Sequence, residues 1–220
     1  MTNLADLRIL IADDHEVFRR GVRDIIEEQP GWQVVAEAGN GRQAVEMARE
    51  LQPDIVVLDI SMPELNGLDA ARQILQASPG CEILILTLHD SEQLAEEVLK
   101  AGVRAYILKS DAAHDLVAAL SALQRHQPMF TSKIAGMVLD GFLHSTRSAK
   151  VSQVAVELTA REREIVQLLA EGKSNKEVAR ALGISVKTAE THRANVMHKL
   201  GLHSTAELVR YALRNRIATE

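Results

Sequence analysis

The sequence of 220 residues has little of several features that would place a protein in a special class. Its single cysteine, Cys81, excludes a disulfide within the chain and suits a reducing compartment. No apolar stretch approaches the roughly 20 residues needed to cross a bilayer, and the N-terminus has no basic region followed by an apolar one. We therefore expect a cytoplasmic protein. Aromatic residues make up only 3% of a chain that is 46% hydrophobic, so its cores should consist mainly of Leu, Ile, Val and Ala.

Charge is distributed unevenly along the chain. Residues 1–127 contain 21 acidic and 11 basic side chains, a net charge of −10. Residues 155–220 contain 8 acidic and 11 basic side chains, a net charge of +3. An acidic half joined to a mildly basic half indicates that only the second half meets a polyanion.

The first half repeats a pattern of a short apolar strand followed by a helix. Strands are predicted near 7–12, 33–38, 55–58, 83–88 and 105–108, and helices near 16–29, 41–52, 66–78, 91–101 and 115–127. Five such units with right-handed crossovers predict an α/β fold, with a doubly wound, five-stranded parallel sheet of order 2-1-3-4-5.

Polar side chains follow four of these strands. Asp13 and Asp14 follow the first strand and Asp59 the third, while Thr87 and Lys109 come at the ends of the fourth and fifth. Because parallel strands end at the same edge of a sheet, we expect these groups to converge there. Carboxylates gathered in this way require a divalent cation, and the ammonium and hydroxyl groups suit an incoming anion.

Phosphoryl transfer matches this set of groups. Asp59, on the central strand, is the candidate nucleophile that would form an acyl phosphate. Asp13, Asp14 and Asp59 would hold Mg²⁺ together with the backbone carbonyl of Ser61. Lys109 and Thr87 would donate to the phosphoryl oxygens.

Two enzyme classes compete with this interpretation. Residues 39–44 (GNGRQA) fit a loose dinucleotide-binding pattern, but they follow the second strand, and the carboxylates of Asp13 and Asp14 in the first turn would repel a pyrophosphate. A phosphatase with Asp59 as nucleophile needs an acid two residues later, where Ser61 stands. We therefore expect a protein that is not an enzyme. His15 begins the first helix, and we expect it to point away from the aspartates.

The chain loses its strand–helix rhythm over residues 128–157, which we interpret as a linker between domains 1–127 and 158–220. The apolar residues Ile134, Met137, Val138 and Phe142 predict one amphipathic helix in this linker. Residues 145–154 (STRSAKVSQV) are typical of a flexible tether.

The third segment carries the signals of an all-α domain with four short helices. Each of the pairs Thr159/Glu162, Ser174/Glu177 and Ser204/Glu207 matches a capping box, and Ser185 caps a fourth helix alone. Glycines stand where the helices should end, at positions 172, 183 and 201. The second and third helices are joined by residues 182–185 (LGIS), which predicts a helix-turn-helix.

The helix at 186–200 should read DNA, because the second helix of this motif enters the major groove. At about 100° per residue, Ala189, His192, Val196 and Leu200 share the face that packs on the domain. The expected DNA-contacting residues lie elsewhere on the helix: Lys187, Thr188, Glu190, Thr191, Ala194, Asn195, His198 and Lys199. The role of Arg193 is left open.

The polar groups of the first half lie in motifs of a known domain. Residues 12–15 (ADDH), 58–67 (LDISMPELNG), 86–87 (LT) and 106–109 (YILK) resemble those of the receiver domain of bacterial two-component response regulators. The resemblance implies that a sensor histidine kinase phosphorylates Asp59, and that Thr87 and Tyr106 then move together, with Tyr106 turning inward. Ser110 departs from the proline that most receivers have after the lysine.

The last segment resembles the LuxR-type, or GerE-type, helix-turn-helix in residues 158–164 (LTARERE), 172–179 (GKSNKEVA), 186–192 (VKTAETH) and 195–200 (NVMHKL). Together the two halves resemble the NarL/FixJ family of response regulators. This implies a phosphorylation-regulated transcription factor that binds double-stranded DNA, and a homodimer when phosphorylated, with the last helix, 205–215, in the dimer contact. The alternative is a receiver whose C-terminal helices bind a protein instead of DNA.

Overall fold

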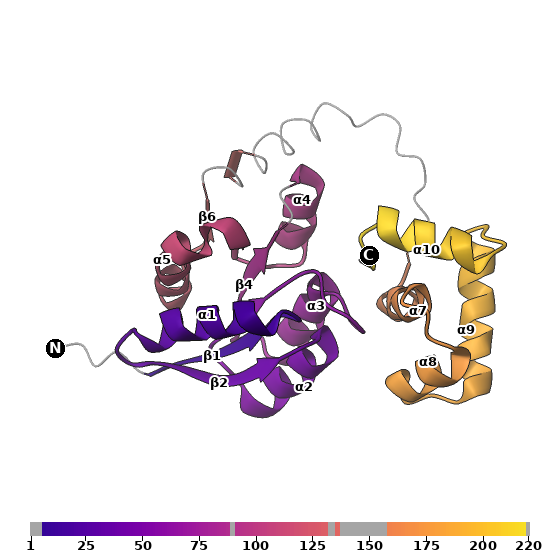
Figure 1. Cartoon of the computed structure of the whole chain (residues 1–220), viewed down its shortest axis with the longest axis horizontal. Coiled ribbons are helices and arrows are strands. Elements are labelled where there is room, and N and C mark those ends of the chain that lie inside the picture. The colour runs from indigo at the N-terminus through magenta and orange to yellow at the C-terminus, as the bar shows by residue number, and fades with distance from the viewer. Residues whose placement is uncertain (1–5, 89–90, 132–134, 137–157, 219–220) are drawn as a thin grey trace. The chain divides into compact units, whose positions relative to one another are not determined.

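The computed structural model describes residues 6–88, 91–131, 135–136 and 158–218, which form two compact units (Figure 1). The helix predicted from Ile134, Met137, Val138 and Phe142 lies outside the described residues. No helix in the described parts of the chain has the length and apolar character that a membrane span requires.

The first unit is built on a parallel sheet of order β2-β1-β3-β4-β5-β6. Its strands are β1 (Leu7–Ala12), β2 (Trp32–Ala38), β3 (Ile55–Leu58), β4 (Glu82–Thr87), β5 (Ala105–Leu108) and β6 (Met129–Phe130). The predicted order of the first five strands is confirmed. The predicted number of strands is wrong by one, because β6 pairs with β5 through only two residues, too few to produce a periodic pattern.

The helices between the strands begin and end within a few residues of the predicted positions. They are α1 (Glu16–Glu27), α2 (Gly41–Leu51), α3 (Gly67–Ala77), α4 (Glu92–Lys100) and α5 (Ala112–Gln124). A 3₁₀ turn, η1 (Lys109–Asp111), leads directly from β5 into α5, so that α5 starts earlier than expected. This short turn places Lys109 at the carboxyl edge of the sheet.

The four inner strands, β1, β3, β4 and β5, are almost entirely buried, and helices cover both faces of the sheet (Figure 1). Ile9 and Ile11 of β1 pack in one core with Val22 and Ile26 of α1, to which the apolar side of α5 also belongs. Leu10, between the two isoleucines, points to the opposite face and is fully buried. Helices α2 and α3 pack against each other, and α2 also contacts β1. A sheet covered on both faces leaves its strand ends as the accessible edge.

The strand register brings the chemically important residues together. Ala12 of β1 pairs with Leu58 of β3, so Asp13 and Asp59 are the next residues of two adjacent strands. In the same way, Thr87 of β4 pairs with Leu108 of β5, which immediately precedes Lys109. The convergence predicted from the strand ends is therefore a consequence of register.

The second unit is all helical, with α7 (Ala160–Ala170), α8 (Asn175–Leu182), α9 (Val186–Lys199) and α10 (Thr205–Arg214). Its core takes residues from all four helices: Ile165, Leu168, Val178, Val196 and Leu208 are almost completely buried. Gly183, with a φ of 63°, ends α8 in the left-handed conformation and makes the turn into α9. The structure therefore contains the predicted helix-turn-helix.

Two of the three predicted capping boxes are present. Thr159 and Glu162 cap α7 reciprocally, and Ser174 and Glu177 do so for α8. At α10, the side chain of Ser204 accepts from the Glu207 amide. However, the Glu207 carboxylate accepts the amide of His203, at 2.7 Å, instead of that of Ser204. The prediction of a third capping box is therefore wrong, because Glu207 accepts the amide of His203, the residue before the N-cap Ser204.

Candidate functional site

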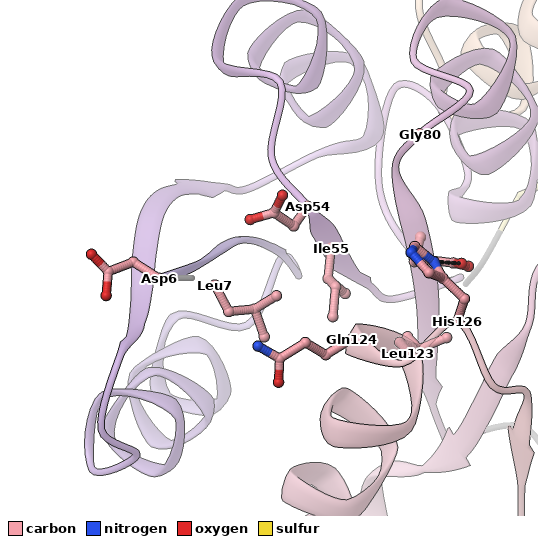
Figure 2. Close-up of a pocket in the computed structure, with 9 residues that line it drawn as sticks. Asp6, Leu7, Asp54, Ile55, Gly80, Leu123, Gln124 and His126 are labelled. Carbon is pink, nitrogen blue, oxygen red and sulfur yellow. Dashed lines mark hydrogen bonds and ion pairs between the residues drawn. The ribbon is translucent and has the colours of Figure 1, made fainter. Parts of the chain in front are cut away.

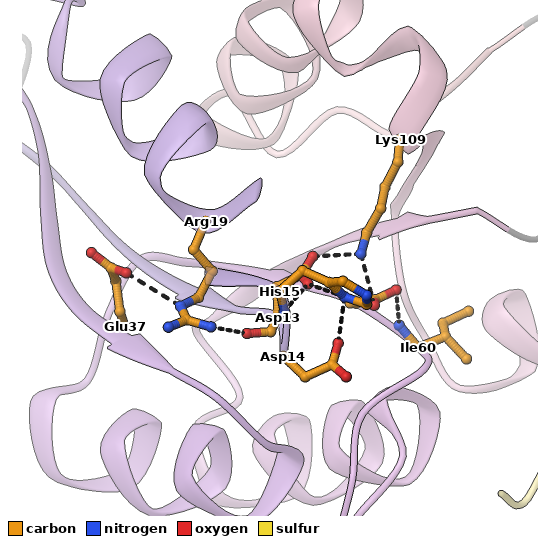
Figure 3. A network of polar contacts seen from close by, with 8 residues as sticks. Asp13, Asp14, His15, Arg19, Glu37, Ile60 and Lys109 are labelled. Carbon is orange, nitrogen blue, oxygen red and sulfur yellow. Dashed lines mark hydrogen bonds and ion pairs between the residues drawn. The ribbon is translucent and has the colours of Figure 1, made fainter. Parts of the chain in front are cut away.

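An acidic pocket lies at the carboxyl ends of β1 and β3 (Figure 3). Asp13 and Asp59 are each only 3% exposed, whereas Asp14 is open to solvent. One possible ligand atom from each of these three carboxylates and from His15 lies within 4.8 Å of the others. Such a cluster of hard oxygen donors is of the kind that Mg²⁺ uses, and the exposed Asp14 leaves room for water ligands. Ser61, whose carbonyl was predicted to join them, is partly exposed in the loop after β3.

Lys109 bridges the two buried carboxylates. Its Nζ lies 2.6 Å from Asp13 Oδ2 and 2.8 Å from Asp59 Oδ2, with 6% of the side chain exposed. The ammonium group also stands 4.7 Å from the centre of the Phe18 ring, an arrangement worth roughly 0.5–2 kcal/mol. Asp59 Oδ1 accepts the amide of Ile60 at 2.7 Å, so both oxygens of Asp59 are held in place.

Burial and pairing act in opposite directions on the pKa of each group in this pair, and the pKa of both groups is raised. Burial raises the pKa of the Asp59 carboxyl above its ordinary value of 3.8, and hydrogen bonding to Lys109 opposes this increase without cancelling it. Burial by itself would lower the pKa of Lys109, but its hydrogen bonds to Asp13 and Asp59 outweigh that effect and raise the pKa. The lysine therefore stays charged, and a further positive charge would help Asp59 to ionise.

The expectation that His15 points away is wrong. His15 is the N-cap of α1, and its amide donates to Asp13 Oδ1 at 2.9 Å. Its Nδ1 lies 2.7 Å from Asp14 Oδ1 and 3.3 Å from Asp13 Oδ1, while 64% of the side chain remains exposed. These contacts are with the two residues that precede His15, and the expectation of a helix start did not include them.

Thr87 and Tyr106 lie on the two strands beyond Asp59. Both are completely buried, Thr87 at the end of β4 and Tyr106 in β5, where it pairs with Ile85. The inward position that was expected for Tyr106 after phosphorylation is therefore already adopted here. A coupled change of Thr87 and Tyr106 would have to start from this packed arrangement.

Three residues around the site were missed by the sequence analysis. The ring of Phe18 lies beneath Lys109, and Arg19 donates to the carbonyl of Asp13 at 2.6 Å. Gly67, the first residue of α3, approaches the backbone so closely that an added Cβ would stand 1.9 Å from the carbonyl oxygen of Asp59. Only Gly67 carried a signal, as the last residue of the motif at 58–67.

A second pocket lies at the opposite edge of the sheet, beside the amino ends of β1, β3 and β4 (Figure 2). Several of its polar groups have partners: Glu82 contacts His126 at 3.0 Å and Arg104 at 3.2 Å. Asp54 accepts the backbone amide of Arg8 at 2.8 Å. We assign no ligand to this pocket.

Helix α9 presents a polar face to solvent. Seven of the eight predicted DNA contacts are exposed, namely Lys187, Thr188, Glu190, Thr191, Ala194, Asn195 and His198. On the packed side, Ala189 and Val196 are buried, and His192 and Leu200 are partly buried. The helical projection therefore separated the two faces correctly.

Three polar side chains of α9, those of Thr188, Arg193 and Lys199, contact residues outside the helix. Lys199 is partly buried and pairs with Glu162 of α7 at 2.7 Å, so it differs from the other predicted contacts. The hydroxyl of Thr188 lies 2.8 Å from that of Ser185, the N-cap of α9. Arg193, whose role was open, donates to the hydroxyl of Thr205 at 3.0 Å and so links α9 to α10.

Comparison with known proteins assigns both units. Residues 9–121 match the response regulator receiver domain, and residues 156–212 match the LuxR family of bacterial regulatory proteins. The chain is 36% identical over 211 residues to the transcriptional regulatory protein LiaR of Bacillus subtilis, covering 96% of this chain and 99% of LiaR. The chain belongs to the NarL/FixJ family of two-component response regulators. This family consists of DNA-binding transcriptional regulators rather than enzymes, although the receiver carries out phosphotransfer chemistry.

Other relatives of this response regulator agree with the assignment. The oxygen regulatory protein NreC of Staphylococcus epidermidis is 37% identical over 215 residues, covering 96% of this chain and 99% of NreC. Among solved structures, RcsB from Salmonella enterica serovar Typhimurium, bound to a promoter in the presence of a phosphomimetic, is 26% identical with a TM-score of 0.59. That match covers 94% of this chain and 97% of RcsB.

Proposed function

We propose that phosphorylation of Asp59, in the presence of Mg²⁺, switches this response regulator to a form that binds promoter DNA through α9. The observation that carries the proposal is the ammonium group of Lys109, held between Asp13 and Asp59 in a buried pocket. A cation in this position neutralises carboxylates at rest and can stabilise the charge of a transferred phosphoryl group.

The cation site would consist of Asp13, Asp14 and Asp59 with the carbonyl of Ser61. Bound Mg²⁺ would supply positive charge to the oxygens of the phosphoryl group. A carboxylate oxygen of Asp59 attacks phosphorus, and the new P–O bond replaces the P–N bond to the phosphorylated histidine of a sensor kinase. The histidine ring leaves with the electron pair of that bond. Lys109 and Thr87 then donate hydrogen bonds to the phosphoryl oxygens.

An apolar groove beside the pocket supports a protein as the phosphoryl donor. It is lined by α1 and the start of α5, with His15, Phe18 and Lys109 on its wall. Val17 and Leu88, which also line it, are 84% and 71% exposed. Large exposed apolar side chains next to a reactive group favour the docking of another protein. A sensor histidine kinase is the partner we propose for this surface.

Coupling between the two halves has two possible routes. In the first, the acidic receiver covers the basic C-terminal domain around Lys187, and phosphorylation releases it; the net charges of −10 and +3 favour that contact, although salt screens it. In the second, phosphorylation drives formation of a homodimer in which α10 takes part. Both are shifts between populations of existing states.

Replacement of Lys187 or Thr191 by alanine should weaken DNA binding of the fragment 155–220 without unfolding it. The side chain of Lys187 is 88% exposed, and Thr191 is also exposed, so neither contributes to the core. Each loss should cost about 1–3 kcal/mol of binding free energy if the contact is to a base edge. Affinity is measured by fluorescence anisotropy on a promoter fragment selected from the source genome.

Arg216→Ala is the control, because it removes an exposed positive charge that lies after α10. We expect it to change the affinity of the fragment much less than the substitutions in α9. Affinity should also fall steeply as salt is raised. Unchanged binding by the Lys187/Thr191 double variant would show that the assigned face is wrong. A fragment that binds no duplex DNA but does bind a protein partner would favour the alternative of a protein-binding domain.

A further inference from the structure

An arginine on α1 reaches the end of β1, next to the acidic pocket (Figure 3). Arg19 Nη1 donates to the carbonyl oxygen of Asp13 at 2.6 Å, and its Nε lies 3.3 Å from Glu37 Oε2. The Arg19 and Glu37 side chains are only 16% and 22% exposed. A hydrogen bond from a charged group is stronger than one between neutral groups, particularly where water is largely excluded.

This contact acts on the peptide that joins the two acidic residues. The carbonyl of Asp13 belongs to the rigid peptide plane shared with Asp14, so its direction restricts how both carboxylates can point. The other side of Asp13 is held as well, because its amide donates to the carbonyl of Ala38 at 3.1 Å. Glu37, the residue before Ala38, anchors Arg19. The whole acidic turn is therefore attached to the end of β2.

Glu37 also reduces the positive charge that Arg19 brings close to the proposed cation site. A lone arginine beside a cation site would repel the incoming cation. Each oxygen of Glu37 lies near an arginine, Oε2 near Arg19 and Oε1 2.8 Å from Arg23. The carboxylate offsets part of the positive charge while it holds the guanidinium group of Arg19 in place.

We propose that Arg19 and Glu37 are a positioning pair that sets the affinity of the acidic pocket for its divalent cation. Arg19 acts through the Asp13–Asp14 peptide, and Glu37 acts through Arg19. The inference rests on the proposed Mg²⁺ site. It goes beyond that site because neither residue is a ligand.

The test compares Arg19→Met with Arg23→Met in the full-length chain. Both arginines lie on α1 and contact Glu37, but only Arg19 donates to the carbonyl of Asp13. Mg²⁺ affinity is measured by titration calorimetry on the unphosphorylated protein, and unfolding by urea is followed in EDTA. Loss of an outer partner of a metal site typically weakens affinity 10–100-fold, so the Kd of Arg19→Met should rise about 10-fold or more. The Kd of Arg23→Met should stay within about twofold of the wild-type Kd, because the Arg23 side chain contacts Glu27 and Glu37 rather than a proposed ligand of the cation.

Three further measurements make the proposal specific. Phosphorylation of Arg19→Met by acetyl phosphate should approach the wild-type maximum at saturating Mg²⁺, because positioning affects the cation requirement rather than the chemistry. Arg19→Met combined with Glu37→Gln should bind Mg²⁺ no more weakly than Arg19→Met alone. Arg19→Lys keeps the positive charge but lacks the forked guanidinium group, so its Kd for Mg²⁺ should lie between those of wild type and Arg19→Met. It replaces Arg19→Met in the test if that variant does not fold.

The possible results distinguish failure of the Arg19–Glu37 proposal from failure of the proposed Mg²⁺ site. If wild-type protein binds no Mg²⁺, the proposed function fails before the pair is tested. If wild type binds Mg²⁺ but Arg19→Met and Arg23→Met raise the Kd equally, Arg19 is only a tether between α1 and β2, and the proposal is overturned. Additive effects in the double variant would overturn the role of Glu37.

Discussion

Asp59→Asn should remove phosphorylation of this response regulator by acetyl phosphate completely. The amide nitrogen and oxygen of asparagine cannot form a stable acyl phosphate, whereas the size of the side chain is unchanged. Wild-type protein with Mg²⁺ should take up a single phosphoryl group, located at Asp59 by mass spectrometry of its peptides. Removal of the cation with EDTA should abolish labelling of the wild type, and added Mg²⁺ should restore it.

Asp54→Asn is the matched control for this experiment. Asp54 immediately precedes β3, the strand that Asp59 follows, so the two carboxylates lie at opposite ends of one strand. Asparagine can still accept the hydrogen bond that Asp54 receives from the Arg8 amide. The control should be labelled to the wild-type extent. Equal labelling of Asp59→Asn and wild type, or labelling that resists EDTA, would place the acceptor elsewhere.

Gly67→Ala should destabilise the receiver severely. A Cβ at this position would stand 1.9 Å from the Asp59 carbonyl oxygen, 2.8 Å from its carbonyl carbon and 2.9 Å from the Ile60 Cα. All three atoms are backbone, so no side chain can rotate away to relieve the clash. We expect a loss of about 3 kcal/mol or more of the unfolding free energy, at the upper end of the usual cost of overpacking. Urea unfolding followed by circular dichroism measures it.

Gly21→Ala is the matched control, and we expect it to stabilise the receiver rather than destabilise it. Gly21 lies inside α1, and an added Cβ would meet no atom within 4 Å. Alanine there should stabilise the receiver by up to about 1 kcal/mol, because glycine is a poor helix former. A Gly67→Ala protein as stable as wild type would show that α3 and the loop before it can move away from Asp59 at little cost.

Much of this architecture was predictable because its signals are local. Buried strands separated by amphipathic helices gave the order of five strands, and the polar residues at their ends gave Asp13, Asp59 and Lys109. The projection of α9 separated buried Ala189 from exposed Lys187 because helical periodicity is regular. A feature that depends on a single strand or helix could therefore be predicted from the sequence of that element.

The features that were missed are of two kinds: local contacts for which the pattern offers more than one geometry, and contacts between elements. Among the local contacts, His15 lies against the two aspartates that precede it, and Glu207 accepts the amide of His203 rather than that of Ser204. Arg19 looks like an ordinary polar residue of α1, and only the fold brings it to the carbonyl of Asp13. The two residues of β6 are a strand through their pairing with β5, which lies elsewhere in the sequence.

The most direct test of the account measures the affinity of the full-length chain for promoter DNA before and after treatment with acetyl phosphate and Mg²⁺. Asp59→Asn and the fragment 155–220 are measured beside it, with affinities expressed per subunit. Phosphorylation should tighten binding by the wild type about 5–150-fold, the usual range of coupling between two sites, and leave Asp59→Asn unchanged. If occlusion is the route, the fragment should bind at least as tightly as the unmodified full-length chain; much weaker binding would leave dimerisation as the route. Equal binding by phosphorylated and unmodified wild-type protein would contradict the proposed switch.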